Sequence, residues 1–166
     1  DRVAKVAEAA KAQGIPIRVG VNSGSIPKDV LSKYSGPTWE ALVESAKRSI
    51  SQLVDEGFED IVVSLKASDV MTTIEAYRAL AELCDFPLHL GVTEAGGVRT
   101  GTVKSSIALG TLLMEGIGDT IRVSLTHEPE EEVQVGIAIL SGIGIAVEGV
   151  EIISCPTCGR CRGDLM

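Results

Sequence analysis

The sequence has few aromatic residues, fewer basic than acidic residues, and no long uninterrupted apolar run. Aromatic residues make up 3% of the 166 residues, and 15 Lys and Arg stand against 23 Asp and Glu, for a formal net charge of −8. An acidic chain with so few aromatic residues lacks the surface with which proteins bind nucleic acid. The longest apolar stretch, residues 137–150, is interrupted by Ser141, by glycines and by Glu148, and is shorter than the roughly 20 residues of a membrane-spanning helix. We therefore expect neither a nucleic-acid partner nor a membrane.

Cysteine is also scarce, and no segment resembles a secretory leader. Three of the four cysteines fall within residues 155–161, a distribution that favours a reducing compartment over a secreted disulfide scaffold. We expect a cytoplasmic protein. The chain starts at Asp1 within a helical pattern and stops at Met166 soon after the cysteines. We expect a piece of a longer protein, with a complete chain whose ends are processed as the alternative.

What the sequence does contain is a regular alternation of helix and strand patterns. We expect helices over residues 2–13, 38–57, 68–84, 102–115 and from 128 onward, and strands over residues 15–22, 60–66, 87–93, 120–125 and 150–154. Residues 23–37 are expected to form a polar loop, and the Ser68 side chain to cap the helix that follows it. Alternating units of this size predict parallel strands joined by right-handed crossovers.

Each expected strand is apolar on one face and polar on the other. In the first strand, for example, Val19 and Val21 share one face while Arg18 and Asn22 share the opposite one. The central strands of an open, doubly wound sheet are covered by helices on both sides and would be apolar on both faces. The pattern favours half of a (β/α)8 TIM-type barrel, since a whole barrel needs about 250 residues. An open flavodoxin-like sheet is the alternative.

The polar faces would place several charged side chains in the lumen of such a barrel or at its mouth. These residues are Arg18, Asn22, Lys66, Glu94, Arg122 and Ser124. Buried cations require anionic partners. Glu94 and acidic residues from strands outside this chain are one possible source of partners, and a polyanionic substrate such as a diphosphate is the other. Glycines in the turn 94–97 add weak support, because they let backbone N–H groups approach an anion.

The cysteines near the end of the chain have the spacing of a metal site. Cys155, Cys158 and Cys161 form a Cys-x2-Cys-x2-Cys motif, which is typical of zinc or iron–sulfur binding. A zinc ribbon needs a second Cys or His pair, and none follows the motif. We favour part of an iron–sulfur site and keep a redox dithiol of the thioredoxin type as a minor alternative. Cys84, on an apolar helix face, is expected to be a small core residue.

Five motifs together resemble one enzyme family. They are RVGVNSGS (18–25), KASDV (66–70), LHLGVTEAGG (88–97), EGIGDTIRVSL (115–125) and CPTCGR (155–160). In this order they are similar to the 4-hydroxy-3-methylbut-2-enyl diphosphate synthase family, the iron–sulfur enzymes of the methylerythritol phosphate route to isoprenoids. The resemblance covers nearly the whole chain.

The resemblance implies a TIM-type barrel followed by a smaller domain with a 4Fe-4S cluster. Residues 1–148 would form the C-terminal half of the barrel, and residues 149–166 the start of the cluster domain. Members of the family open the ring of 2-C-methyl-D-erythritol 2,4-cyclodiphosphate and remove a hydroxyl by two-electron reduction, with electrons from ferredoxin or flavodoxin.

The resemblance also implies roles for particular residues. Glu94 would be the acid that helps the oxygen leave, and Cys155 and Cys158 the first two cluster ligands. Substrate would be bound by Arg18, Asn22, Lys66, Arg122 and Ser124. Cys161 has no recognised counterpart, and a further cysteine and a glutamate expected downstream are absent from the chain. We expect this piece alone to be inactive.

Half a barrel would also leave two sheet edges open, which favours self-association. We therefore expect a homodimer. The alternative function, from a different class, is a non-catalytic half-barrel module that binds anions or a metal through its cysteine tail.

Overall fold

The computed structural model describes residues 2–145, which alternate between helices and strands as expected. The expected strand over residues 150–154 and the cysteines at 155, 158 and 161 lie outside the described residues. The strands are β1 (Ile17–Asn22), β2 (Ile61–Lys66), β3 (His89–Gly91) and β4 (Thr120–Arg122). The helices are α1 (Arg2–Gln13), α2 (Lys28–Tyr34), α3 (Trp39–Asp55), α4 (Val70–Ala81), α5 (Val98–Met114) and α6 (Pro129–Gly142), with a short 3-10 helix, η1 (Ser23–Ser25).

The four strands are parallel and lie in chain order. β1 pairs with β2 from Ile17 beside Ile61 to Asn22 beside Lys66, and β3 pairs with β4 from His89 beside Thr120 to Gly91 beside Arg122. A parallel bridge between Val63 and Leu88 joins the two pairs. A flavodoxin-like sheet reverses its strand order at a switch point, whereas this order runs β1-β2-β3-β4. The barrel prediction is confirmed, and the flavodoxin-like alternative is wrong.

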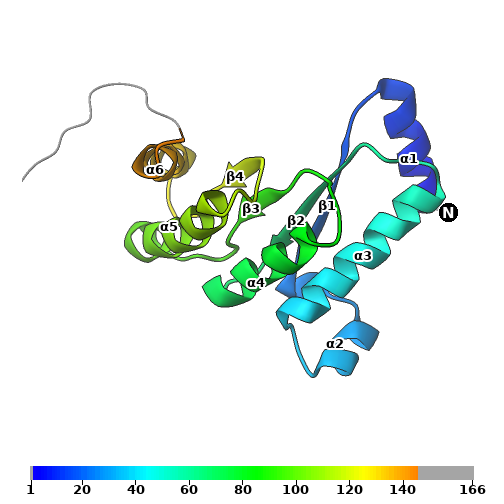
Figure 1. Cartoon of the computed structure of the whole chain (residues 1–166), viewed down its shortest axis with the longest axis horizontal. Coiled ribbons are helices and arrows are strands. Elements are labelled where there is room, and N and C mark those ends of the chain that lie inside the picture. The colour runs from blue at the N-terminus through cyan, green and yellow to red at the C-terminus, as the bar shows by residue number, and fades with distance from the viewer. Residues whose placement is uncertain (1, 146–166) are drawn as a thin grey trace, which may run out of the picture.

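The helices cover one face of these strands. α3 packs on β1 and β2, α4 on β2, α5 on β3 and α6 on β4, and each of these helices contacts the next. Figure 1 shows α3, α4, α5 and α6 following one another along the strands. The opposite face of β1 is uncovered, since Arg18, Gly20 and Asn22 are all exposed. We call this uncovered side of the strands the lumen face.

The core lies between the strands and the helices. The side chains that point from the strands toward the helices are buried, as the alternation predicted: Val19, Val21, Ile61, Val63, Leu65, Leu88, Leu90, Val92 and Val123. Fully buried helix residues pack against them, among them Leu42 of α3, Leu80 of α4 and Leu109 of α5. Burial of this apolar surface is the main term that holds the helices on the strands.

The prediction of a loop over residues 23–37 is wrong. This segment contains η1 and α2, and Val30 of α2 is fully buried. A helix of seven residues offers too few turns for a recognisable apolar period. Ser35 ends α2 in the left-handed conformation, with φ of 58°.

Two predicted helix starts also need correction. α4 is capped by Asp69 rather than Ser68, because the Asp69 carboxylate accepts a hydrogen bond of 2.7 Å from the Thr72 N–H. α5 begins at Val98, directly after Gly97, rather than near residue 102. β3 and β4 have three residues each and are shorter than predicted. The predicted helix from 128 is confirmed, with Pro129 in its first turn.

Gly118→Ala should destabilise the fold strongly. Gly118 has φ of +114°, and a Cβ there would lie 2.4 Å from Cδ1 of the fully buried Leu90. Backbone strain and overpacking together should lower the free energy of unfolding by about 2–4 kcal/mol, measurable by urea denaturation. Gly116→Ala is the matched control, because Gly116 also has positive φ (+77°) but nothing within 4 Å. Equal losses in the two variants would contradict the role of the Leu90 contact.

Candidate anion-binding site on the lumen face

The strand register aligns the polar side chains of the lumen face in rows. Neighbours in a parallel ladder point to the same side of the sheet. Asn22 lies beside Lys66 and Gly91 lies beside Arg122, while the bridge from Val63 to Leu88 sets Lys66 beside Gly91. One row therefore contains residues 22, 66, 91 and 122, and the adjacent row contains Gly20, Ser64, His89 and Thr120.

Lys66 is the buried centre of this face. Lys66 is only 6% exposed to solvent. Burial, followed by the positive charges of Arg122 and Arg18, lowers the pKa of Lys66 to about 8. The structure thus brings Lys66 close enough to Arg18 and Arg122, the other two cations that the sequence predicted for the lumen, for their charges to repel it.

No carboxylate neutralises these cations within residues 2–145. The ion pairs of this part of the chain involve Lys33, Arg48 and Arg78, all outside the lumen face. Glu94, one of the predicted internal partners, makes no ion pair with Arg18, Lys66 or Arg122. Three converging cations without a carboxylate are an arrangement suited to a polyanion.

Because Gly91 has no side chain, the Lys66 side chain can lie over it. A Cβ on Gly91 would lie 3.2 Å from Cε and 3.5 Å from Nζ of Lys66, and 2.9 Å from the backbone oxygen of Arg122. The Lys66 side chain therefore lies across β3 toward β4. A glycine is needed here because the strand and the lysine approach each other closely.

His89 belongs to the same face, although no role was predicted for it from the sequence. Its Nδ1 lies 2.8 Å from the Thr120 hydroxyl oxygen, and its Nε2 is buried without a partner among the described residues. Burial, followed by the charges of Lys66, Arg18 and Arg122, lowers the pKa of His89 to about 4. The imidazole is therefore neutral at pH 7 and adds no fourth cation. The inward position of His89 was readable from strand alternation, but its partner on the next strand was not.

Glu94 and Ser124 lie at the ends of β3 and β4. Glu94 is exposed and has φ of +52°, a left-handed conformation that side chains rarely adopt. Ser35, at the end of α2, is the other non-glycine residue with positive φ in residues 2–145. The Thr126 N–H donates to the Gly96 carbonyl at 3.0 Å, so the turn after β3 and the chain after β4 meet at one rim.

Asn22 ends β1 at the same level as Lys66. Its backbone N–H donates to the Ser25 hydroxyl, and this hydroxyl donates to the Asn22 carbonyl, both at 2.9 Å. These bonds fix the chain where the Asn22 side chain joins the lumen row. The structure thus sets Asn22, Lys66 and Arg122 in one row, with Arg18 near them and Glu94 and Ser124 at the rim.

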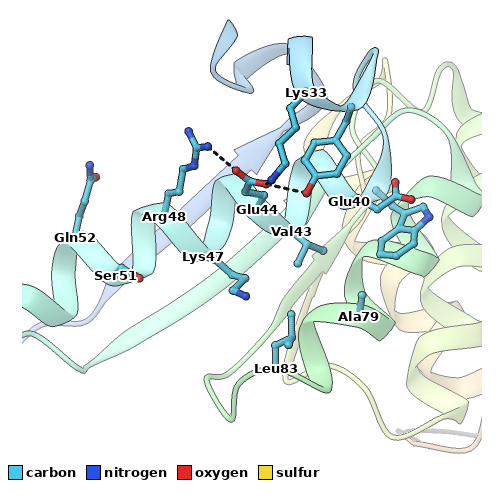
Figure 2. A pocket seen from close by; sticks show the side chains of 12 residues that line it. Lys33, Glu40, Val43, Glu44, Lys47, Arg48, Ser51, Gln52, Ala79 and Leu83 are labelled. Carbon is cyan, nitrogen blue, oxygen red and sulfur yellow. Dashed lines mark hydrogen bonds and ion pairs between the residues drawn. The ribbon is translucent and has the colours of Figure 1, made fainter. Parts of the chain in front are cut away.

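A hollow on the outer side of the helices is a weaker candidate. It is a groove of about 770 Å³ between α2, α3 and α4, lined by Lys33, Tyr34, Glu44 and Arg48 among others. As Figure 2 shows, these charged side chains point toward one another. The hydrogen bond from Lys33, with others from Tyr34 and Arg48, lowers the pKa of Glu44 to about 2. Lys33 and Arg48 are already paired with carboxylates, and Lys47 is the one lining cation that makes no ion pair within residues 2–145. This groove therefore offers no cluster of unpaired cations to a polyanion.

The described residues hold no metal site of their own. Within residues 2–145, no group of three or more His, Cys, Asp or Glu side chains is arranged to bind a metal ion. The metal-site prediction falls on Cys155 and Cys158, outside this part of the chain. No helix of the described residues has the length and apolar character needed to cross a membrane.

Parallel strands in chain order, helices on one side and a cationic lumen face define part of a TIM barrel. Residues 1–137 match the family model of the GcpE TIM-barrel domain, and the chain belongs to this family.

Three curated relatives share the name 4-hydroxy-3-methylbut-2-en-1-yl diphosphate synthase (flavodoxin). The chain is 58% identical over 168 residues to the protein of Desulfotalea psychrophila, covering 99% of this chain and 46% of the relative. It is 58% identical over 166 residues to that of Caldanaerobacter subterraneus subsp. tengcongensis, covering 100% and 47%. It is 60% identical over 161 residues to that of Thermodesulfovibrio yellowstonii, covering 97% and 46%. The family resemblance is confirmed, and the chain spans about half the length of these relatives.

Proposed function

We propose that this chain provides the diphosphate-binding part of an enzyme acting on 2-C-methyl-D-erythritol 2,4-cyclodiphosphate. The enzyme opens the ring and removes a hydroxyl, which yields 4-hydroxy-3-methylbut-2-enyl diphosphate. The observation that carries this proposal is the convergence of Arg18, Lys66 and Arg122 without a carboxylate partner in residues 2–145. The names of the relatives, which specify a diphosphate product, support it.

In this proposal the lumen side chains have separate tasks. The guanidinium groups of Arg18 and Arg122 bind phosphate oxygens in a bidentate manner, and Lys66 acts as a point charge. The Asn22 amide and the Ser124 hydroxyl donate hydrogen bonds to the same anion. Glu94, at the end of β3, gives a proton to the oxygen that leaves as water.

The reduction requires two electrons and two protons for each water released. We propose a 4Fe-4S cluster with Cys155 and Cys158 as two of its ligands, in a domain that starts near residue 149. When bound, such a cluster supplies the electrons one at a time. Ferredoxin or flavodoxin is the proposed electron donor, and the names of the relatives specify flavodoxin.

The remaining proposals concern assembly. Since the relatives are about twice as long as this chain, we propose that the barrel is completed by sequence beyond it and that the described half alone is inactive. In the described half alone, the outer edges of β1 and β4 have no partner strand within residues 2–145 and suit self-association, so we propose that this half forms a homodimer, in the cytoplasm.

The experiment that tests this function uses the complete protein, produced anaerobically with iron and sulfide. Conversion of the cyclic diphosphate is followed by phosphorus NMR with chemically reduced flavodoxin or ferredoxin. The proposal expects the linear diphosphate to appear in proportion to the electrons supplied. Binding of the cyclic diphosphate without conversion would instead favour a non-catalytic anion-binding module.

Arg122→Met should weaken substrate binding by about ten- to a hundredfold, the contribution of one charge-assisted bidentate contact. Isothermal titration with the cyclic diphosphate measures the change. Arg48→Met is the control, because Arg48 pairs with Asp29 and Glu44 on the outer groove rather than with the lumen. Unchanged affinity in Arg122→Met would remove Arg122 from the site.

A further inference from the structure

Tyr77 of α4 reaches from the helix layer into the seam between two strands. The residue is fully buried. Its hydroxyl accepts a hydrogen bond of 3.0 Å from the Leu65 N–H of β2 and donates one to the His89 carbonyl of β3. One side chain thus forms hydrogen bonds with the backbones of two strands.

The hydroxyl stands where a direct strand-to-strand bond would otherwise form. On one side of it the Val63 N–H donates to the Pro87 carbonyl at 2.8 Å, and on the other the Thr93 N–H donates to the Ala67 carbonyl at 3.1 Å. The spacing of a parallel ladder would pair the Leu65 N–H with the His89 carbonyl between these two bonds. Because the Tyr77 hydroxyl bridges this pair, β2 and β3 are held apart at this point.

This point lies beside the cationic site. Leu65 directly precedes Lys66, and His89 is itself a lumen residue. Burial raises the pKa of Tyr77, and the Leu65 backbone, the Ser64 side chain and the charge of Arg18 oppose that rise. Ser64 and Arg18 belong to the lumen face, so the hydroxyl interacts with groups on both sides of the sheet.

We propose that Tyr77 is a positioning residue of the lumen site, whose hydroxyl fixes the separation of β2 and β3 and thereby the place of Lys66 across Gly91. Only its effect on substrate rests on the proposed function. Removing the hydroxyl leaves the ring in the core but frees the Leu65 N–H and the His89 carbonyl, which then require water or a shifted strand. Either change moves Lys66 relative to Arg18 on β1, His89 on β3 and Arg122 on β4, the charged or titratable residues that face it.

The test compares Tyr77→Phe with Ile74→Val in the complete protein. Ile74 lies on the same helix, is 3% exposed and makes no bond to the seam, so its variant reports the effect of lost stability alone. We expect Tyr77→Phe to raise KM for the cyclic diphosphate by about tenfold, the effect of one lost buried hydrogen bond, with a smaller change in kcat. Ile74→Val should lower Tm about as much as Tyr77→Phe does but leave KM unchanged.

A second measurement needs no substrate. The rate of Lys66 acetylation by acetic anhydride, followed against pH by mass spectrometry, should have its midpoint near pH 8 in the wild type. Tyr77→Phe should move this midpoint upward, because water entering the seam hydrates the ammonium group, and Ile74→Val should not. A wild type that binds no cyclic diphosphate would overturn the proposed function, while this profile would still decide the role of Tyr77.

Equal behaviour of Tyr77→Phe and Ile74→Val in KM and in the acetylation profile would overturn the inference. If Tyr77→Phe does not fold, 4-fluorophenylalanine at position 77 replaces it, since its fluorine occupies the place of the hydroxyl but donates no hydrogen bond to the His89 carbonyl. A change in KM and in the Lys66 midpoint then supports the inference, and no change in either overturns it.

Discussion

Lys66→Met is expected to remove most of the affinity for the cyclic diphosphate and to make the folded protein more stable at neutral pH. Loss of a buried charge that binds phosphate should weaken binding by about ten- to a hundredfold. Stability should rise because Lys66, only 6% exposed and surrounded by like charges, is held charged at a cost. Its lowered pKa corresponds to a gain on the order of 1–3 kcal/mol when the ammonium is replaced by an apolar side chain.

The pH dependence gives this prediction a definite sign. Lys66 has a pKa of about 8 in the folded protein, against an ordinary value of 10.5 for an exposed lysine. Between these values the unfolded chain binds more protons than the folded chain, so the contribution of Lys66 to stability rises with pH. The free energy of unfolding is measured with urea at pH 7 and pH 10 in both proteins. The wild type should gain stability relative to Lys66→Met as the pH rises. Substrate affinity should fall as pH rises through 8 in the wild type only.

Gly91→Ala is the matched variant, which keeps the positive charge of Lys66 but displaces its side chain. The new Cβ would lie 2.9 Å from the Arg122 carbonyl and 3.2 Å from Cε of Lys66, so the lysine must move. We expect weaker substrate binding without the gain in stability. Lys66→Met with wild-type affinity, or with lower stability at pH 7, would contradict the assignment of Lys66 as a buried, ligand-binding cation.

The sequence predicted the parts of the fold that local patterns determine. Alternation in β1 separates the buried Val19 and Val21 from the exposed Arg18 and Asn22, and this one-sided burial distinguishes a barrel from a doubly wound sheet. Helix α2 was missed because it is short and its burial depends mainly on packing against α3. The cap at Asp69 was assigned one residue early because Ser68 has the same capping chemistry.

Of the candidate site, only the charged residues could be predicted from the sequence. Arg18, Lys66 and Arg122 all lie on the polar faces of predicted strands, and the structure brings them together; their roles in binding stay predictions. Tyr77, Gly91 and Thr120 were not assigned from sequence. Their importance depends on contacts across strands, such as the bond between His89 and Thr120, which are 31 residues apart, and no local pattern encodes such a contact.

Glu94→Gln is expected to leave substrate binding near normal and to lower turnover by at least ~100-fold, the lower end of general acid–base contributions. Glutamine keeps the shape and the hydrogen-bonding capacity of the side chain but cannot deliver a proton in the same way. KM and kcat of the complete protein, measured with chemically reduced flavodoxin, separate binding from chemistry. Normal turnover in this variant would make Glu94 a structural residue of the rim.

Glu94→Gly separates the side chain from the backbone at the same position. Glu94 holds a φ of +52° with an exposed side chain and makes no ion pair with Arg18, Lys66 or Arg122, so within residues 2–145 the structure shows no stabilising contact that explains a glutamate there. Glycine adopts this conformation without strain, and we expect the free energy of unfolding to stay constant or to rise by up to about 1 kcal/mol. Turnover should nevertheless fall at least as far as in Glu94→Gln. A variant that is more stable and inactive would show that the glutamate is kept for chemistry at the expense of backbone strain, whereas a clear loss of stability would assign Glu94 to the fold.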